Sequence, residues 1–365
     1  MHKSMITVLH VVGGDETTSG VLSVARQLAF VKQEGLEQRI WKHRDFRADR
    51  DPDSYVNAGW ARKTNRSVTG DLIAGSVDFV PLFLWARRRP NLILHAHSRA
   101  GLIAAAAASR VAAVPLICHQ HALARNTSLY ERIWSQTAAT VVFNSSKTQS
   151  HFGRTAGNSL VLMPPIIWPT QGPLRDAVPS MRFVASSSYF RWKRIHLIAE
   201  AYELLRGAGL HSHLVINGLT IDPIDAPYQG EMQERFGKAE GIELRFYSTR
   251  WLEELRASDV FVHAAEAEPF GIVILEAFSR GCRLVVPEGT FLDDLPEPVR
   301  TDGIFRAAVP TAEGFAAAMQ IATDSEVDPA ELWERRQTVR GLFSAETQVR
   351  QLTSLYTQRL GADWK

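Results

Sequence analysis

The stretch DVFVHAAEAEPFGIVILEAFSRGCRLVVP, residues 259–287, decides the fold. It begins with a short, mostly apolar run, Asp259–His263, and ends with a second one, Leu284–Pro287, and both are typical of strands in a buried parallel sheet. Between them, a polar loop turns at Phe270-Gly271 into an apolar helix that ends at Gly281. A strand, a helix and a second strand form a βαβ unit, so the stretch predicts a parallel sheet covered by helices.

Two carboxylates occupy informative positions in this unit. Glu268 lies in the loop after the first strand, and Glu276 lies in the opening turn of the predicted helix. Ligands of open parallel sheets bind outside the carboxyl ends of the strands, and helix N-termini attract anions. Acids at such a place fit as acceptors for hydroxyl groups that flank the anion. A nucleotide-diphosphate sugar has this chemistry, because its diphosphate lies between ribose hydroxyls and sugar hydroxyls.

The same stretch resembles the E-x7-E motif of retaining GT-B glycosyltransferases of family 4. The run E-P-F-G…L-E-A-F-S-R-G-C-R-L-V-V-P is similar to that family's E-x-F-G…E-A-x-x-x-G-x-P-V-V-A, and Glu268 and Glu276 match its two acids. The resemblance implies an α/β fold of GT-B type, with two Rossmann-like domains and an interdomain cleft. It also implies roles: Glu276 accepts from the ribose, and Glu268 binds hydroxyls of the transferred sugar. The backbone after Phe270 and Gly271, beginning at Ile272, faces the diphosphate.

A second match is a basic segment that follows a predicted strand, Met181–Ala185. The family pattern there is G-R-x-x-x-x-K-G, and Lys193 fits its lysine. Ser188 stands where the family has its arginine, and Arg194 stands in place of the final glycine. We expect Arg191 or Arg194 to join Lys193 at the diphosphate, because fixed positive charge stabilises the negative charge that develops on the departing phosphate.

Two further matches lie in the first half of the chain. TSGVLSVARQLA, residues 18–29, is similar to the family's G-G-V/A-x-x-x-V-x-x-L-A, with Gly20 as the second glycine and Ser19 as a helix N-cap in place of the first. Gly13-Gly14 is a rival for close approach to the ligand. The segments HAH, 95–97, and HQH, 119–121, resemble the family's H-x-H and T-x-H, which implies that His121 lies beside the donor sugar.

The paired histidines also allow a metal site. Residues two apart in an extended chain share a face, so each pair could converge on one ion. No acid or cysteine ligand is placed with them, and the resembling family needs no metal or other cofactor. We therefore expect a donor-site histidine and no metal, and plain packing of the histidines is the other interpretation.

The chain's organisation predicts two domains. Strand-like and helix-like segments alternate twice, with a proline-rich linker candidate at 163–179. We expect an acceptor-side domain over 1–170, a nucleotide-sugar domain over 171–345, and a last helix, 346–365, that crosses back to the first domain. Residues 65–70 read as a loop, 77–88 as a helix with Pro81 in its first turn, and 251–257 as a helix.

Composition and charge limit the setting of the protein. Its 365 residues suit two soluble domains, and its two cysteines are too few for a disulfide framework or a cysteine zinc site. The start of the chain has no signal-peptide pattern, and the Ala-rich run 101–118 is too broken to span a bilayer. We expect a cytoplasmic protein with buried thiols.

The charge is divided unevenly along the chain. Residues 1–170 hold 20 Lys and Arg against 11 Asp and Glu, whereas the remainder is acidic. Basic groups beside Trp41, Trp60 and Trp85 suit peripheral contact with an anionic inner membrane face, and solvated surface charge is the other interpretation. No nucleic-acid motif accompanies them.

The expected function is a retaining, metal-independent hexosyltransferase. Its donor would be a UDP-, GDP- or ADP-sugar, and its acceptor a glycan or lipid-linked molecule of cell-surface polysaccharide or glycolipid synthesis. A nucleotide-sugar epimerase of GT-B fold is one alternative. A non-catalytic nucleotide-sugar binder is another, because Ser188 and Met163-Pro-Pro165 depart from the family pattern.

Overall fold

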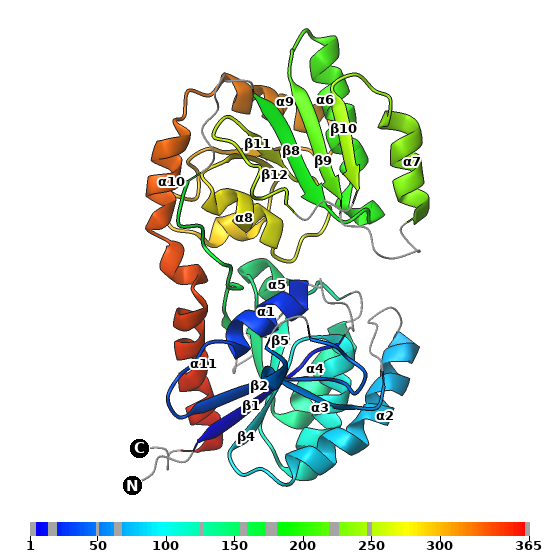
Figure 1. The fold of residues 1–365 in the computed structure, drawn as a ribbon, viewed down its shortest axis with the longest axis vertical. Coiled ribbons are helices and arrows are strands. Elements are labelled where there is room, and N and C mark those ends of the chain that lie inside the picture. Colours follow the sequence, from blue (N-terminus) through cyan, green and yellow to red (C-terminus); the bar gives the residue numbers. More distant parts are fainter. Residues whose placement is uncertain are drawn as a thin grey trace. The chain divides into compact units, whose positions relative to one another are not determined.

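The computed structural model describes residues 5–13, 20–48, 51–61, 68–124, 127–153, 159–172, 181–218, 226–246 and 250–361. The chain divides into two compact units: unit 1 comprises residues 1–166 and 342–365, and unit 2 comprises residues 167–341. The expected domain boundaries, 170/171 and 345/346, lie close to these divisions. Each unit is a parallel sheet with helices on both faces (Figure 1).

Unit 1 is built on a seven-stranded parallel sheet in the order β3-β2-β1-β4-β5-β6-β7. The chain begins inside the sheet at β1 and adds β2 and β3 on one side of it. It then crosses to the other side of β1 and adds β4 to β7 there. The topological switch point, where ligands of such sheets bind, therefore lies between β1 and β4. The strands are β1 Ile6–Val11, β2 Leu36–His43, β3 Tyr55–Gly59, β4 Leu92–Ala96, β5 Leu116–Gln120, β6 Thr140–Phe143 and β7 Ser159–Val161.

The two faces of this sheet differ in chemistry because side chains alternate along each strand. One face is apolar, with Leu9, Leu94 and Cys118 in a core shared with α2, α3 and α4. The other face carries histidines, and α1 and α11 pack against each other in the same unit. The helices are α1 Gly20–Ala29, α2 Val68–Ala86, α3 Arg99–Ala112, α4 Thr127–Thr137, α5 Ser146–His151 and α11 Ala345–Leu360.

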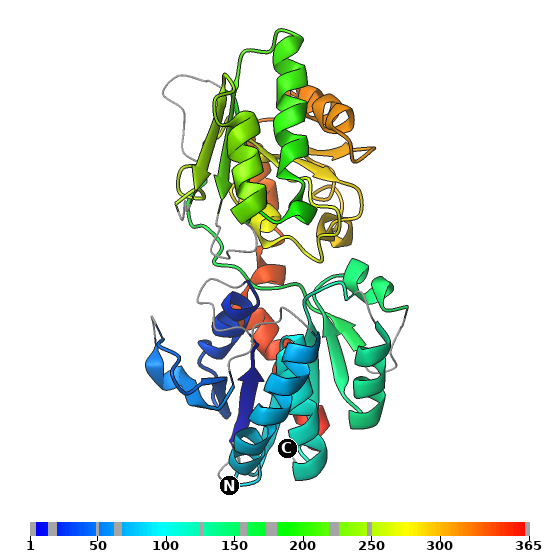
Figure 2. The same ribbon diagram turned by 90° about the vertical axis from the view of Figure 1, so that its right-hand side faces the viewer.

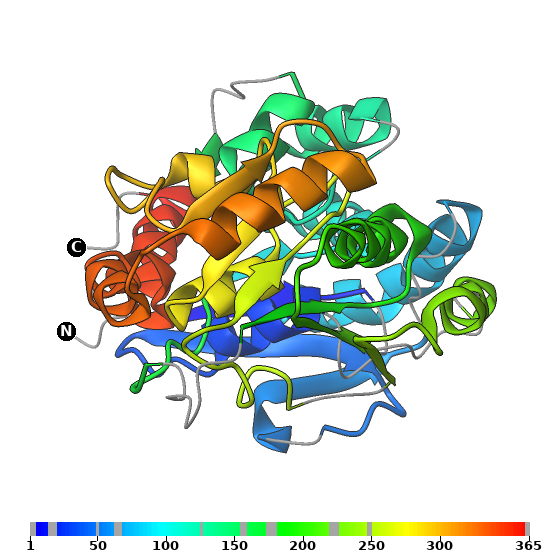
Figure 3. The ribbon, with the colours of Figure 1, turned by 90° about the horizontal axis from the view of Figure 1, so that it is seen from above.

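Unit 2 repeats the same winding with six parallel strands in the order β10-β9-β8-β11-β12-β13. Its switch point lies between β8 and β11. The strands are β8 Arg182–Ser187, β9 His213–Gly218, β10 Ile242–Phe246, β11 Val260–Val262, β12 Arg283–Pro287 and β13 Ile304–Ala307. The helices are α6 Ile195–Gly207, α7 Ala226–Phe236, α8 Ile272–Ser279, α9 Ala312–Asp324 and α10 Pro329–Gln337. Helices α6 and α9 lie side by side (Figure 3), and α8 packs on α10.

Two sequence predictions of local structure were wrong. Helix α2 begins at Val68 and has Pro81 in its interior, so residues 68–70 are helical and the helix starts nine residues earlier than expected. It runs along α3 (Figure 2), and a Cβ on Gly75 would lie 2.6 Å from Ile103 Cγ2, so close tertiary packing outweighs the hydrogen bond lost at the proline.

The second wrong prediction is the helix over 251–257, because these residues are not helical and 251–254 form a turn. The carboxylate of Asp259 accepts from the backbone N–H of Arg256 at 2.8 Å and pairs with Arg182 on β8. This buried acid therefore takes a backbone donor that a helix would direct to its own carbonyl groups.

Candidate functional site

The segment that holds Lys193 and the segment that holds Glu268 and Glu276 come together in unit 2. Strands β8 and β11 are neighbours, so the loops that follow them leave the same edge of the sheet at its switch point. The first loop forms a short 3-10 turn, Arg191–Lys193. The second holds Glu266, whose backbone N–H donates to the carbonyl of Trp192 at 2.9 Å. This bond ties the two loops together.

Glu268 is the centre of the cluster that these loops form. Lys193 Nζ lies 2.5 Å from Glu268 Oε2, and His263 Nε2 donates to the same oxygen at 3.0 Å. All three side chains are largely buried, with 9% of Glu268 and 3% of His263 exposed. Burial by itself raises the pKa of Glu268, but the charge of Lys193 and the hydrogen bond from His263 outweigh it and lower the pKa to about 2. Glu268 is therefore a fixed carboxylate.

The second oxygen of Glu268 is left open. Within the described ranges, no hydrogen bond or ion pair reaches Oε1. Because Oε2 is held by two donors, the carboxylate is oriented and Oε1 is available to accept from a ligand hydroxyl.

Gly271 sets the start of the next helix. Its φ is +91°, and an added Cβ would lie 2.7 Å from Ile274 Cδ1 and 3.1 Å from Glu268 Cγ. Phe270 is buried and stacks on Phe291 with ring centroids 4.3 Å apart. The turn between Glu268 and α8 is therefore rigid and requires glycine.

Helix α8 begins beside this turn with two N–H groups that no described residue accepts. The N–H groups of Ile274 and Leu275 donate to the carbonyl of Gly271, which is the first acceptor of the helix. The N–H groups of Ile272 and Val273 lie before these two donors and have no acceptor within the helix. Unpaired N–H groups at a helix start form an anion-binding site.

Glu276 lies one turn further along α8 than expected, as the fifth residue of the helix. Its side chain is half-buried, and its carboxylate has no partner in the part of the chain that the structure describes. Burial raises its pKa to about 7. The two motif glutamates therefore have opposite electrostatic surroundings.

The neighbouring arginines are occupied by other acids. Arg191 is 67% exposed, pairs with Glu231 and stacks over the ring of Tyr228. Arg194 Nη2 lies 2.6 Å from Glu266 Oε1. Of the three basic residues expected at the diphosphate, only Lys193 contacts Glu268.

Sequence reasoning missed His263 as a functional residue. It is the residue directly after β11, and its backbone N–H donates to Val285 on β12. Its only sequence signal was a histidine at the carboxyl end of a buried strand, five residues before the matched glutamate.

Unit 1 brings five histidines together on one face of its sheet. They come from β1, β4, β5 and the residues that follow β4 and β5, and adjacent rings lie 4.2–5.5 Å apart: His10, His95, His97, His119 and His121. Burial lowers the pKa of every one of them, to about 4 for His10 and about 3 for His121. The five rings are therefore neutral near pH 7.

Hydrogen bonds fix the tautomers of three of these rings. The side-chain amide of Gln38 donates to the carbonyl of Leu28 at 2.7 Å, so its oxygen accepts from His10 Nε2 at 3.1 Å. His10 Nδ1 must then accept from His97 Nε2, at 2.8 Å.

The chain of bonds ends at His121. Since His97 Nε2 carries the proton, its Nδ1 accepts from His121 Nε2 at 3.1 Å. Nδ1 of His121 is left as an acceptor, and no described residue donates to it. We call this series, Leu28–Gln38–His10–His97–His121, the histidine relay.

Two overlapping groups of these residues have the composition of a metal site. Ligand atoms of His10, His95 and His97 lie within 4.8 Å of one another, as do those of His97, His119 and His121. Both ring nitrogens of His97, which belongs to both groups, are already hydrogen-bonded to other histidines. The observed arrangement is therefore a hydrogen-bonded chain, and a metal would require His97 to give up a bond.

The predicted glycine loop is described only in part. Gly20 is the first residue of α1 and is exposed. Ser19 and Gly14 lie outside the described residues. Gly13 donates through its backbone N–H to Ser98 Oγ at 2.6 Å.

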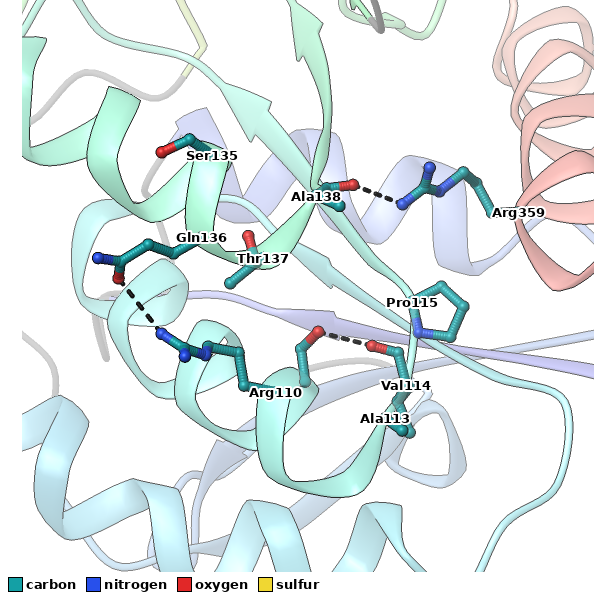
Figure 4. Close-up of a pocket in the computed structure, with 10 residues that line it drawn as sticks. Arg110, Ala113, Val114, Pro115, Ser135, Gln136, Thr137, Ala138 and Arg359 are labelled. Atoms are coloured by element: carbon teal, nitrogen blue, oxygen red, sulfur yellow. Dashed lines mark hydrogen bonds between the residues drawn. The ribbon is translucent and has the colours of Figure 1, made fainter.

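A shallow depression of about 500 Å³ lies elsewhere on unit 1 (Figure 4). It is lined by the segments that enter β5 and β6, including Arg110 and Gln136, and by Arg359 of α11. This is the amino edge of the sheet, opposite to the edge where such folds bind ligands. We do not assign it to the functional site.

Comparison with known proteins is consistent with this geometry. Residues 176–292 match the family model of glycosyl transferases group 1. This match contains the Lys193 and Glu268 loops and helix α8. No curated protein matches the chain.

Solved structures resemble the chain over nearly its whole length. Anabaena HepE in complex with UDP and glucose is 16% identical, with a TM-score of 0.73, and 97% of this chain and 99% of that chain are covered. Sucrose-phosphate synthase from Thermosynechococcus elongatus is 16% identical, with a TM-score of 0.74 over 97% and 98%. The lipopolysaccharide outer core galactosyltransferase WaaB is 12% identical, with a TM-score of 0.65 over 95% and 100%. These likenesses confirm the predicted GT-B fold.

Proposed function

We propose that this protein is a retaining glycosyltransferase that moves a sugar from a nucleotide-diphosphate sugar to an acceptor. The observation that carries the proposal is the convergence of Lys193 and His263 on one oxygen of Glu268, beside N–H groups at the start of α8 that no described residue accepts. This cluster lies inside the region that matches glycosyl transferases group 1. A cation, an oriented carboxylate and a helix start are the groups that a sugar diphosphate needs.

Each group has a distinct task in the proposal. The N–H groups of Ile272 and Val273 and the ammonium of Lys193 bind the diphosphate. Glu268 Oε1 accepts from a hydroxyl of the transferred sugar, and Glu276 accepts from the ribose. In unit 1, Nδ1 of His121 supplies a further acceptor for a hydroxyl group.

The reaction requires no protein nucleophile. The bond between the anomeric carbon and the phosphate oxygen breaks, and the acceptor oxygen bonds to the same carbon on the same face. The acceptor proton moves to the departing phosphate. Lys193 stabilises the charge that develops on that phosphate, so its contribution is greatest in the transition state. We propose a metal-independent, hexosyl type of transfer, as the resemblance to family 4 implies.

The donor and the acceptor are proposed by class. A UDP-sugar is the first donor to test, because Anabaena HepE has been crystallised with UDP and with UDP-glucose. We propose a glycan or lipid-linked acceptor of cell-surface polysaccharide or glycolipid synthesis. A lipopolysaccharide outer core galactosyltransferase is among the solved structures that resemble the chain. A cytoplasmic enzyme at the inner membrane face fits this role.

The test is a donor screen followed by one substitution. UDP, GDP, ADP and their sugars are compared by thermal shift, and the donor that binds is assayed for sugar release and transfer. Lys193→Met should lower turnover by about 10²-fold or more, the scale of losing a group that meets developing charge. Arg194→Met is the matched control, because Arg194 pairs with the exposed Glu266.

Three outcomes would contradict the proposal. Nucleotide binding without turnover of any donor would identify a non-catalytic binder. An isomerised sugar without transfer would identify an epimerase. Wild-type turnover in Lys193→Met would remove this lysine from the mechanism.

A further inference from the structure

Helix α2 of unit 1 carries an apolar stripe on its exposed side. Apart from one adjacent pair, its members recur at intervals of three or four residues and therefore lie on one side of the helix. They are 37–62% exposed, and we call them the α2 outer face: Val68, Leu72, Ile73, Val77, Val80 and Leu84. An apolar stripe of this length on a surface helix marks an interaction site.

The two charged residues of α2 point away from this stripe. Asp71 is fully buried and pairs with Arg99 at 2.6 Å. Asp78 is also buried, and it accepts from Trp41 Nε1 at 2.9 Å and from the backbone N–H of Trp60 at 2.7 Å. The usual arrangement of a surface helix, with charges outside, is reversed, so the α2 outer face carries no charge.

Positive charge is placed at the end of the stripe. Arg87 and Arg88 follow α2 directly and are exposed. Arg89 lies over the ring of Trp85, with its guanidinium carbon 3.6 Å from the ring centroid. Trp60, which is 53% exposed, precedes the helix in sequence. Tryptophan and arginine beside apolar helix surface are typical of the membrane interface.

Helix α2 is suited to lie on a membrane rather than to cross it. By length and composition alone it could span a bilayer, but a third of its apolar window is buried in unit 1. Spanning would also separate Asp71 from Arg99 and Asp78 from Trp41, leaving two carboxylates in hydrocarbon.

We propose that the α2 outer face docks on an anionic lipid surface, with its apolar side chains among the acyl chains and Arg87 and Arg88 at lipid phosphates. The same stripe of a second copy would offer apolar area but no acid of its own to these arginines, because Asp71 and Asp78 of α2 are buried. Anionic lipid satisfies both features. This assignment does not depend on the glycosyltransferase proposal, since it rests on a different element and on binding alone.

Vesicle binding by the full chain tests the proposal. Sedimentation is measured with phosphatidylcholine vesicles that contain or lack phosphatidylglycerol. We expect binding only to the anionic vesicles, with weaker binding at higher salt. The Arg87→Gln/Arg88→Gln variant should bind about 30-fold more weakly, because each basic residue near an anionic surface contributes a factor of about five. The Ile73→Gln/Val77→Gln variant should bind about tenfold more weakly or worse, because it loses apolar contact with the acyl chains.

Matched controls separate this surface from general effects. Ile321→Gln removes an isoleucine that is 60% exposed on α9, against 62% for Ile73, and should bind as wild type does. Arg340→Gln/Arg350→Gln removes the same charge from exposed positions elsewhere. Equal binding by the α2 variants and the wild-type protein would overturn the proposal. Equal binding to both vesicle types would also overturn it. So would a wild-type protein that binds no vesicles and forms a dimer, if the Ile73→Gln substitution dissociates that dimer.

Discussion

Glu268 and Glu276 show how environment separates two chemically identical groups of one motif. Glu268 has a cation and a histidine donor on one oxygen and stays ionised at every working pH. Glu276 is half-buried with no described partner, and its pKa is raised to about 7. Glu276 therefore becomes a good acceptor only when a ligand or solvent compensates its burial.

This difference predicts a pH-dependent stability effect at residue 276. The folded pKa of Glu276 lies above its unfolded value near 4.5, so the folded state holds the proton longer. Stability is then lost as pH rises from about 4.5 to about 7. Glu276→Gln should raise the free energy of unfolding at pH 8 by about 1–2 kcal/mol, a shift of one unit being about 1.4 kcal/mol before solvent screening is discounted.

Urea unfolding of ligand-free protein at pH 4.5 and pH 8 measures this effect. The variant and the wild-type protein should be equally stable at pH 4.5. Glu288→Gln, at an exposed position without a described partner, is the control and should change neither value. A variant that is less stable than wild type at pH 8 would show that the Glu276 carboxylate is favourably paired in the fold.

The sequence predicted that Lys193 and Glu268 lie in loops at the ends of strands, and the structure brings these two side chains into contact. Their roles in a site stay predictions. It did not decide between Arg191 and Arg194. Their partners, Glu231 and Glu266, are placed by α7 and by the loop after β11, which are distant in sequence. His263 was missed because its role depends on a bond to Glu268 that only the folded loop creates.

At the scale of elements, alternation along strands explains the histidine face of unit 1. His10 on β1 is paired in register with His95 on β4, so histidines on neighbouring strands fall on one face while Leu9 and Leu94 fall on the other. The sequence showed the H-x-H spacing but not His10, since register between strands 85 residues apart is a tertiary property. Helix α2 was misjudged for a related reason, because its buried charges and exposed apolar residues invert the usual helical pattern.

The histidine relay predicts a consequence for Gln38→Met. The substitution leaves the carbonyl of Leu28 without its donor and His10 Nε2 without its acceptor. We expect a loss of about 1–3 kcal/mol in the free energy of unfolding, the scale of unsatisfied buried groups. We also expect His10, His97 and His121 to change from a single Nε2–H tautomer to a mixture, which nitrogen-15 NMR of the imidazoles resolves.

Gln348→Met is the matched control for this experiment. Gln348 is a fully buried glutamine of the same unit, and its side-chain oxygen has no partner among the described residues. The control should lose some stability but keep all three tautomers. Unchanged tautomers in Gln38→Met would mean that the rings are oriented by packing and not by the relay.

At the scale of the molecule, both units use the same strand order, and each candidate cluster falls at a switch point. This could be anticipated, because the repeated alternation of strands and helices restricts the topology to a doubly wound sheet. The position where the chain returns to unit 1 was less certain, since helix α11 is recognised only by the apolar face that it buries. Val349, Leu352 and Tyr356 are fully buried, and the hydroxyl of Tyr356 lies 2.9 Å from His95 Nδ1.

The division of the chain predicts how a protein that ends at Gly341 behaves. Such a chain lacks α11, and each of Val349, Leu352 and Tyr356 contributes about 1.5–3 kcal/mol by burial, so their sum approaches the whole stability of a domain. Unit 1 should then lose its cooperative fold, whereas unit 2, continuous from 167 to 341 with its own core, should keep it. Hydrogen exchange by mass spectrometry should show protection lost in β1 and β4 and retained in β8 and β11.

Tyr356→Phe in the full chain is the control, because it removes only the bond to His95 and should cost about 1 kcal/mol. Full protection of β1 in the shortened chain would mean that residues 1–166 close their sheet without α11, and the division of the chain would then have to be drawn differently.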